Sequence, residues 1–506
     1  MWESSARTVE HRRNRLRYHD DGRAGVSGCR LALAILAAGV AAFAQESTPL
    51  LWAVHENNVS EVQRLLASGA NANAKNDYGL SPLAEASAIN NTAIIKALLD
   101  AGAEPNALHF DGQTALMVIV RGTNVDAAKL LIAKGANVNI AEAQKNQTAL
   151  MWAAAQNNGP MVKILLDAGA DPNARAMIND IPSQVSAEPR AQHRSYGGLT
   201  PLIYATREGC LDCISYLVER GAKLNTSDPE GITPLITAIA NFHFDAAKIL
   251  IEAGANPDKW DWWGRSPLYL AADVNTIPRG GRADAPSTDE TTSLEIMEIL
   301  LKRGANPNTQ LKLLPPFRNV GADRGVDQLL QIGASPLLRA AKALDAPAVK
   351  LMMEYGGNPN LPTNRGITPT MAAAGMGSVD ADTRGRYDTP DTAQRSIDTL
   401  KILLDKGGEL MGRDPRGQTP LHAAAFWGWN DTVKFLAERG ADVNAKDNRG
   451  LVPIDNAMGR NGGNSRGGAR IDVHKDTAEL LEKLGATPVI PPPPAPPKPA
   501  GAKPAR

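Results

Sequence analysis

A short motif recurs along most of this chain at a nearly constant spacing. Thr-Pro-Leu, or a close variant, usually returns after 33 residues. Its occurrences start at Thr48, Ser81, Thr114, Thr148, Thr200, Thr233, Ser266, Ser335, Thr368 and Thr419, with a degenerate last copy at Val452. Where nothing is inserted, Gly-Ala-Asn or Gly-Ala-Asp follows 21 residues after the start, at Gly69, Gly102, Gly135, Gly169, Gly221, Gly254 and Gly440. A fixed period of this length indicates a repeat array, in which each unit packs only against its neighbours.

Each repeat has a predictable local structure. The Thr or Ser caps a short first helix by accepting an unpaired backbone N–H, and proline fits the first turn because it has no N–H to leave unpaired. A second helix follows, with apolar residues at helical spacing such as Val62, Leu65 and Leu66. The glycine of Gly-Ala-Asn then ends that helix in the left-handed conformation. About ten polar residues lead to the next repeat, which predicts an exposed hairpin turn.

One repeat matches a known consensus almost completely. Thr419-Pro-Leu-His-Ala-Ala-Ala, followed by Gly440-Ala-Asp-Val-Asn-Ala-Lys-Asp, resembles the ankyrin repeat family. The resemblance covers roughly residues 47 to 487, as ten repeats and a C-terminal cap. It implies an all-α solenoid of helix-turn-helix units with β-hairpin fingers. Only His422 keeps the family's histidine after leucine, so elsewhere apolar packing replaces the Thr-to-His hydrogen bond.

The charge balance limits the classes of partner. The chain has 54 basic and 54 acidic residues, and its formal net charge is zero. Nucleic acids and anionic membranes are bound by basic surfaces, so neither is an expected partner. Because such an array buries its core between neighbouring repeats, we treat residues 45–487 as one elongated domain and expect a monomer.

The two ends of the chain differ from the array. Leu31 to Ala44 is a continuous apolar run of 14 residues that ends in Ala-Phe-Ala before Gln45. This pattern predicts a signal peptide over residues 1–44, with an over-long N-terminal region and cleavage after Ala44. The run is too short to span a bilayer, so we expect a periplasmic or secreted protein with no stable membrane span after cleavage. Residues 488–506 are proline-rich and predict a disordered tail.

Long insertions interrupt the period. They fall near residues 175–198, 275–292, 309–333, 375–394 and 459–468. Loop entropy rises slowly with length, so exposed turns tolerate insertions of this size. Neutral drift at exposed turns is one explanation for any single insertion, and a role in binding is the other. Two of the insertions enlarge hairpins on the edge where ankyrin-like proteins usually contact partners, which favours a role in binding.

Aromatic residues gather at two positions of that kind. Trp260, Trp262, Trp263 and Arg265 lie in the hairpin before the seventh repeat, and Phe426 and Trp427 end the first helix of the tenth. Tryptophan and arginine most often carry interface energy, and exposing them costs solubility. We therefore predict that these six residues bind a protein partner. The alternative is that the tryptophans pack against the neighbouring insertion and stabilise it.

The mature chain would contain two cysteines, Cys210 and Cys213. Their spacing is that of a thioredoxin-like redox pair, and in an oxidising compartment they can close a disulfide. They also stand where small apolar residues pack at the start of a second helix, so a purely structural interpretation stays open.

The sequence favours a binding protein over an enzyme. It contains no His-Glu-x-x-His, no phosphate-binding Gly-x-x-x-x-Gly-Lys and no Gly-x-Ser-x-Gly, so we predict no catalytic, cofactor or metal site. The first hypothesis is a non-enzymatic scaffold in the cell envelope or outside it, which binds a protein through hairpin fingers and first helices. The alternative is a redox or hydrolytic enzyme whose site combines the insertions with Cys210 and Cys213.

Overall fold

The computed structural model describes residues 48–109, 111–179, 195–275, 288–313, 332–377, 391–460 and 473–489. These residues form short helices and one two-stranded sheet. The helices are α3 (Pro49–His55), α4 (Val59–Ala67), α5 (Pro82–Ile89), α6 (Thr92–Asp100), α7 (Ala115–Arg121), α8 (Val125–Ala133), α9 (Ala149–Ala155), α10 (Gly159–Asp167), α11 (Pro201–Glu208), α12 (Leu211–Glu219), α13 (Pro234–Ala240), α14 (Phe244–Glu252), α15 (Pro267–Asn275), α16 (Ser293–Lys302), α17 (Pro336–Lys342), α18 (Ala346–Glu354), α19 (Pro369–Ala373), α21 (Thr392–Asp405), α22 (Pro420–Trp427), α23 (Asn430–Glu438), α24 (Pro453–Ala457) and α25 (Lys475–Lys483). The strands are β1 (Ile178–Asn179) and β2 (Tyr196–Gly197).

The first helices begin where the repeated motif predicts. Thr200 lies just before α11, and its hydroxyl accepts a hydrogen bond from the Ile203 backbone N–H at 3.3 Å, while Pro201 occupies the first turn. The same cap forms at Thr48, Ser81, Thr114, Thr148, Thr233, Ser266, Ser335 and Thr368. Each cap pairs one of the otherwise unbonded N–H groups of a helix N-terminus. The predicted helix starts are therefore confirmed.

The second helices end at the predicted glycines. Gly169 follows α10 with φ +86°, and Gly440 follows α23 with φ +95°. A residue with a Cβ is strained in this left-handed region, whereas glycine is not. The chain can therefore reverse sharply after each second helix and run toward the next hairpin.

The described chain divides into two compact units, and the boundary runs through α7 and α8. The N-terminal unit comprises residues 48–118 and 133–135, and the C-terminal unit comprises residues 119–132 and the described residues from 136 onward. In the N-terminal unit the first helices α3 and α5 pack together, as do the second helices α4 and α6. Leu50, Val62 and Ile94 are among the residues buried between these helices.

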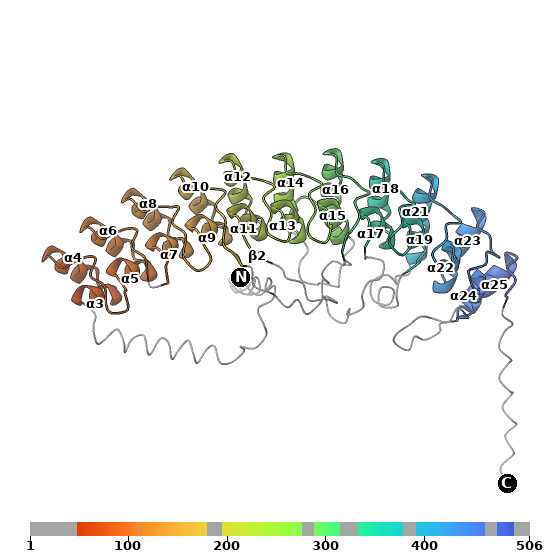
Figure 1. Cartoon of the computed structure of the whole chain (residues 1–506), viewed down its shortest axis with the longest axis horizontal. Helices are drawn as coiled ribbons and strands as arrows, with labels where there is room; N and C mark the ends of the chain where they lie inside the picture. Colours follow the sequence, from red (N-terminus) through yellow and green to blue (C-terminus); the bar gives the residue numbers. More distant parts are fainter. Residues whose placement is uncertain are drawn as a thin grey trace, which may run out of the picture. The chain divides into compact units, whose positions relative to one another are not determined.

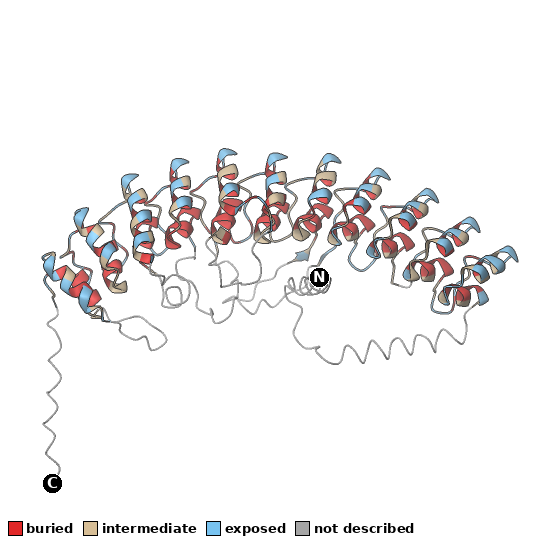
Figure 2. Ribbon diagram, turned by 180° about the vertical axis from the view of Figure 1, so that it is seen from behind, coloured by how far each residue is buried: buried red, intermediate tan, exposed pale blue. Residues whose placement is uncertain are grey.

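The C-terminal unit has two rows of helices. Its first helices pack in chain order, α9, α11, α13, α15, α17, α19, α22 and α24, and its second helices do the same from α10 to α25 (Figure 1). The core lies where the rows and neighbouring repeats meet, while the ends of the second helices are exposed (Figure 2). Leu202, Leu235 and Leu268, the leucines that follow the motif prolines in α11, α13 and α15, are almost completely buried. The predicted all-α repeat solenoid is thus what the structure shows.

The hairpin fingers contain little regular strand. In the described part of the chain, β1 pairs with β2 antiparallel, and two isolated bridges join Leu108 to Thr114 and Ala141 to Thr148. Most of the fingers are tight turns, closed for example by the Asp414 N–H donating to the Gln418 carbonyl at 3.0 Å. The β-hairpins of the expectation are therefore mainly hydrogen-bonded turns rather than extended ladders.

Several predicted features lie partly or wholly outside the described residues. The signal segment 1–44 and most of the tail 488–506 are not described. The insertion near 175–198 begins and ends at the β1–β2 hairpin, and the one near 309–333 begins and ends at a hairpin where the Leu311 N–H donates to the Ala334 carbonyl at 3.0 Å. The insertion near 275–292 joins α15 to α16, the one near 375–394 joins α19 to α21, and the one near 459–468 joins α24 to α25.

At six junctions between repeats, an asparagine four residues after the helix-ending glycine bonds the next repeat. Asn139 donates its side-chain N–H to the Gly169 carbonyl at 2.9 Å and accepts the Asp171 backbone N–H at 2.8 Å. The same two bonds are made by Asn73 in the N-terminal unit and by Asn173, Asn308, Asn360 and Asn444 in the C-terminal unit. We call this set the asparagine ladder.

Candidate partner-binding surface

Four hairpin turns of the C-terminal unit are held by an aspartate in the same way. Asp261 accepts the backbone N–H groups of Trp263 at 3.1 Å and Arg265 at 2.9 Å through a single carboxylate oxygen. Asp228, Asp414 and Asp447 each accept two turn N–H groups in the same way. Such a side chain fixes the turn locally, because it hydrogen-bonds the backbone two and four residues on.

Neighbouring hairpins are joined into a continuous edge. The Trp262 N–H donates to the Glu230 carbonyl at 2.7 Å, and the Lys312 N–H donates to the Trp263 carbonyl at 2.8 Å. Long side chains also bridge neighbouring hairpins by donating to carbonyls of both. Arg175 donates to the Gly198 and Ser227 carbonyls, and Arg413 donates to the Gly417 and Lys446 carbonyls. Gln310 bonds the Gly333 and Pro362 carbonyls in the same way. The hairpin edge is therefore held in place on both sides of the tryptophan turn.

Two of the three predicted tryptophans are exposed on this edge. Trp260 is 44% exposed and Trp262 is 45% exposed. The Lys312 ammonium lies 3.6 Å from the centroid of the Trp260 ring, which is the geometry of a cation–π contact. Trp260, Trp262 and Lys312 thus form an exposed apolar and cationic surface, which we call the tryptophan face.

Trp263 and Arg265 depart from the expected exposure. Trp263 is only 3% exposed, and the Arg265 guanidinium lies 4.8 Å from its ring centroid. Arg265 also donates its Nε–H to the buried carboxylate of Asp261 at 2.6 Å, which ties it to the turn. The expectation that all three tryptophans protrude is therefore corrected, since Trp263 and Arg265 build the turn that presents Trp260 and Trp262.

Phe426 and Trp427 occupy the end of α22. Both are half-buried, with their ring centroids 5.0 Å apart in an edge-to-face arrangement. The Trp427 indole N–H donates to the Gly375 carbonyl of the preceding repeat at 2.8 Å. This hydrogen bond links Trp427 to the preceding repeat. The role of Phe426 and Trp427 in binding a partner stays a prediction.

Cys210 and Cys213 form a disulfide at the start of α12. Their sulfurs are 1.98 Å apart and their Cα atoms 5.2 Å apart. The Cys210 sulfur also accepts the Cys213 backbone N–H at 3.2 Å, as the N-cap of the helix. Both residues are buried, so a partner thiolate has no direct approach to either sulfur. Burial of this kind is typical of a structural disulfide rather than a catalytic one.

The turn aspartates differ in their electrostatics. The pKa of Asp228 is raised to about 6, chiefly by burial. The carboxylates of Glu230 and Asp261 add to the rise, and hydrogen bonds from the Ile232 and Glu230 N–H groups oppose it. At Asp447 burial also acts to raise the pKa, but hydrogen bonds from backbone N–H groups and the Arg449 charge outweigh it, so the pKa lies below its usual value.

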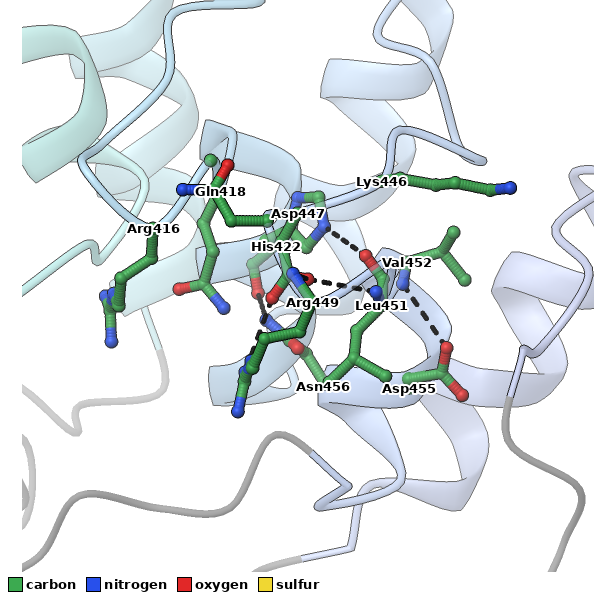
Figure 3. Close-up of polar contacts among 12 residues, drawn as sticks. Arg416, Gln418, His422, Lys446, Asp447, Arg449, Leu451, Val452, Asp455 and Asn456 are labelled. Atoms are coloured by element: carbon green, nitrogen blue, oxygen red, sulfur yellow. Dashed lines mark hydrogen bonds and ion pairs between the residues drawn. The ribbon is translucent and has the colours of Figure 1, made fainter.

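His422 makes the one expected Thr-to-His contact. Its Nδ1 lies 2.9 Å from the Thr419 hydroxyl, and its Nε2 lies 3.3 Å from the Leu451 carbonyl of the next hairpin (Figure 3). Burial lowers the pKa of His422, which favours the neutral ring. The Asn456 side chain donates to the His422 carbonyl, so a polar network joins the tenth repeat to the cap.

Two arginines next to this network, Arg416 and Arg449, were not predicted from the sequence as functional residues. Arg416 and Arg449 each form an ion pair with the turn aspartate two residues earlier, Asp414 and Asp447. Figure 3 shows Arg449 beside Asp447. Their recurrence one period apart in Asp-x-Arg-Gly was the signal that could have found them. The asparagine ladder was missed for a similar reason, although its spacing from the glycines is constant.

The described ranges contain neither a cluster of metal ligands nor a helix that could cross a bilayer. No group of three or more His, Cys, Asp or Glu side chains there is placed to hold a metal ion. No helix in those ranges has the length and apolar character needed to cross a bilayer.

Comparisons with known families identify the repeats. A model of three consecutive ankyrin repeats matches residues 26–109, 86–176 and 223–311. A model of a single ankyrin repeat matches residues 197–229 and 416–448. Together the two models match more than half of the chain.

Similar curated proteins share the repeats over short stretches. The E3 ubiquitin-protein ligase KEG of Arabidopsis thaliana is 32% identical over 105 residues, which are 21% of this chain and 5% of that protein. The putative ankyrin repeat protein L371 of Acanthamoeba polyphaga mimivirus is 27% identical over 172 residues, 34% of this chain and 20% of that protein. Human palmitoyltransferase ZDHHC17 is 42% identical over 130 residues, 26% of this chain and 21% of that protein. The chain thus spans about a fifth or less of each relative.

Solved structures with similar folds include two ankyrin repeat domains. That of human ASB11 aligns with a TM-score of 0.38 and 22% identity, and covers 52% of this chain and all of that one. That of Bcl-3, a member of the IkappaB family, aligns with a TM-score of 0.38 and 23% identity, and covers 50% of this chain and 98% of that one.

Proposed function

Because this chain belongs to the ankyrin repeat family, we propose that it is a non-enzymatic module that binds a protein partner through its hairpin turns and first helices. Ankyrin repeats are in general protein–protein interaction modules, and the fold by itself does not name a partner. The location of the binding surface must therefore come from the side chains of this chain.

The observation that carries the proposal is the exposure of Trp260 and Trp262. Both indoles are nearly half exposed on a turn that is anchored by Asp261 and bonded to the hairpins on either side. A tryptophan can bury about 150 to 250 Å² of surface in an interface, and a rigid turn loses little entropy on binding. The buried neighbour Trp263 supplies a matched comparison, since it has the same chemistry without the exposure.

The experiment compares these tryptophans in the full chain. The wild-type protein would be used to capture its partner from an extract of the native cell envelope, and the captured protein would then be titrated. We expect the double change Trp260→Ala and Trp262→Ala to weaken binding by at least about 2 kcal/mol with little change in melting temperature. Trp263→Ala should instead lower the melting temperature, because it leaves a cavity. A large loss of stability with intact binding in the double variant would refute the proposal.

We also propose that the protein works in the periplasm or outside the cell. The apolar run Leu31 to Ala44 and the disulfide between Cys210 and Cys213 support this location, because disulfides persist in oxidising compartments. Intact mass measurement of native material tests both points. We expect a chain that begins at Gln45 and is lighter by about two hydrogens than its reduced form. A full-length, reduced protein as the sole native species would contradict the proposed location.

A further inference from the structure

The hairpins that follow the tryptophan turn carry an excess of positive charge. Their charged residues are Lys312, Arg365, Arg413, Arg416, Lys446 and Arg449, with Asp414 and Asp447 as the acids, within the described ranges 310–313, 332–334, 362–367, 412–418 and 445–451. The preceding hairpins are balanced. Their charged residues are Glu142, Lys145, Arg175, Asp228, Glu230, Lys259, Asp261 and Arg265, within ranges 141–147, 175–179, 195–198, 226–232 and 259–265. The positive excess therefore starts at the tryptophan face and continues toward the cap.

Two of the arginines are held in place by buried carboxylates. The Arg416 Nε–H donates to Asp414 at 2.9 Å, and Arg449 lies 3.3 Å from Asp447. The arginine side chains are 57% and 49% exposed, whereas the two aspartate side chains are 2% and 0% exposed. A guanidinium has five N–H donors, and the Arg416 Nε–H bond to Asp414 uses one of them. Arg416 thus presents an exposed guanidinium to an external carboxylate in a preset orientation.

Three of the other cations, Lys312, Arg413 and Lys446, form no ion pair with an acid in the part of the chain that the structure describes. Arg413 donates to the Gly417 and Lys446 carbonyls, which carry no net charge. Lys312 lies over the Trp260 ring, and Lys446 is exposed without an acidic partner among the described residues. The surface therefore retains a net positive charge.

The charged hairpins and the tryptophan face form one edge. The Lys312 N–H bonds the Trp263 carbonyl, the Asn364 N–H bonds the Ile332 carbonyl at 3.1 Å, and the Asn448 N–H bonds the Arg416 carbonyl at 2.8 Å. Ile332 is exposed, and it extends the apolar end of the edge beyond Trp260 and Trp262. An apolar end is thus followed by a cationic stretch.

We propose that the partner contributes an extended acidic segment that begins with apolar residues. The apolar residues contact Trp260, Trp262 and Ile332, and the carboxylates that follow pair with the hairpin cations. With helices about 8 to 10 Å apart, the five hairpins from the tryptophan turn to the last one span about 32 to 40 Å. An extended chain of about 10 to 12 residues covers that length. This inference rests on the proposed function and names the chemistry of the partner.

The chain's own C-terminal segment does not fit this surface. Residues 488–506 contain Lys498, Lys503 and Arg506 and no acidic side chain, so the cationic hairpins would repel them. Nucleic acid shares the negative charge of the proposed segment, and its bases can stack on tryptophan, but it carries charge along its whole length. The proposed surface instead has its tryptophan face at one end and its excess positive charge beyond it. A partner protein whose segment has apolar residues followed by acidic residues supplies both the apolar end and the negative charge.

The test uses the full chain and a labelled twelve-residue peptide, with two leucines followed by alternating glutamate and alanine. Fluorescence anisotropy would measure binding at low and at physiological salt. We expect saturable binding that weakens with salt, and at least a tenfold loss of affinity in the double variant Lys312→Glu and Lys446→Glu. The matched control Lys145→Glu and Lys223→Glu makes the same change in net charge away from the cationic hairpins, at one balanced hairpin and just after α12, and should lose less than twofold.

Several results would overturn the inference. These are no binding of the acidic peptide, equal loss in the two double variants, equal binding of a peptide with lysine in place of glutamate, or equally tight binding of a single-stranded oligonucleotide of the same charge. Unchanged melting temperatures of both variants would show that any loss is not caused by unfolding. If the peptide fails to bind but Trp260→Ala with Trp262→Ala still loses the native partner, the proposed function stands and the acidic partner is wrong.

Discussion

The four turn aspartates are alike in backbone contacts and unlike in charge neighbours. Asp261, Asp414 and Asp447 each pair with an arginine of their own turn. Asp228 is instead partly buried beside the carboxylates of Glu230 and Asp261, and burial together with these charges raises its pKa to about 6. The charged form of Asp228 is therefore disfavoured in the folded protein, whereas an ordinary exposed aspartate has a pKa of about 3.9.

We predict that Asp228→Asn stabilises the protein at neutral pH. The folded pKa lies above the unfolded one, so the folded state binds more protons between about pH 4 and pH 6, and this group's contribution to stability is lost as the pH rises through that range. Asparagine keeps the oxygen that accepts the Glu230 and Ile232 N–H groups and carries no charge. Chemical denaturation should show a gain on the order of 2 kcal/mol at pH 7 and little difference at pH 4.

Asp447→Asn serves as the control for this prediction. The pKa of Asp447 lies below its usual value, so removing its charge should cost stability at pH 7, with an effect that shrinks as the pH falls through the range where the carboxylate is protonated. Equal responses of the two variants at pH 7 would contradict the difference in charge environment.

At the tryptophan turn, the sequence predicted the position of the three tryptophans but not their individual exposure. The sequence placed Trp260, Trp262 and Trp263 on a hairpin, but it did not distinguish the exposed pair from the buried member. Burial of Trp263 depends on the next hairpin, where the Lys312 and Leu313 N–H groups bond its carbonyl. That hairpin follows after a whole repeat with an insertion, so local spacing carries no information about the contact.

At the level of elements, the regular features were predictable because each depends on a few adjacent residues. The caps at Thr200 and its equivalents, the proline turns and the glycine ends follow from the motif itself. The hairpins were expected to contain more strand, but a side-chain oxygen such as that of Asp414 bonds the turn N–H groups that a ladder would use. The described helix boundaries follow the motif even where insertions separate the repeats.

The asparagine ladder has a weak step at Met411. Its sulfur lies 3.4 Å from the Asp442 N–H that an asparagine would bond, and sulfur is a poor acceptor. We predict that Met411→Asn raises the free energy of unfolding by about 1 kcal/mol, because it supplies a stronger acceptor for Asp442 and a donor for the Gly440 carbonyl. Thermal or urea denaturation measures the effect.

The matched comparison replaces a ladder asparagine by methionine at a position where both ladder hydrogen bonds are present. Asn360 bonds the Gly407 carbonyl and the Glu409 N–H, both at 2.8 Å. Asn360→Met should lower the free energy of unfolding by a similar amount. A neutral result for both variants would show that the ladder orients the repeats without stabilising them.

At the scale of the whole molecule, stability is local because repeats contact only their neighbours. Leu235 in α13 is 1% exposed, and α13 packs against α11 and α15. We predict that Leu235→Ala costs about 2 to 5 kcal/mol and that hydrogen exchange shows the loss mainly in those three repeats. Glu252→Ala on the exposed side of α14 should leave exchange nearly unchanged. Uniform loss of protection along the chain would contradict the local character of the array.

The asparagine ladder also makes the length of the array adjustable. Each rung reaches in the same direction along the chain, from one repeat to the glycine carbonyl and backbone amide of the next, as Asn173 does with Gly221 and Lys223. Excising residues 200–232, one full period, would present Asn173 with the equivalent groups of Gly254 and Asn256. The junctions with a ladder asparagine are thus equivalent to one another. The number of repeats can therefore change by whole units, because the asparagine at the new junction finds the same carbonyl and N–H partners.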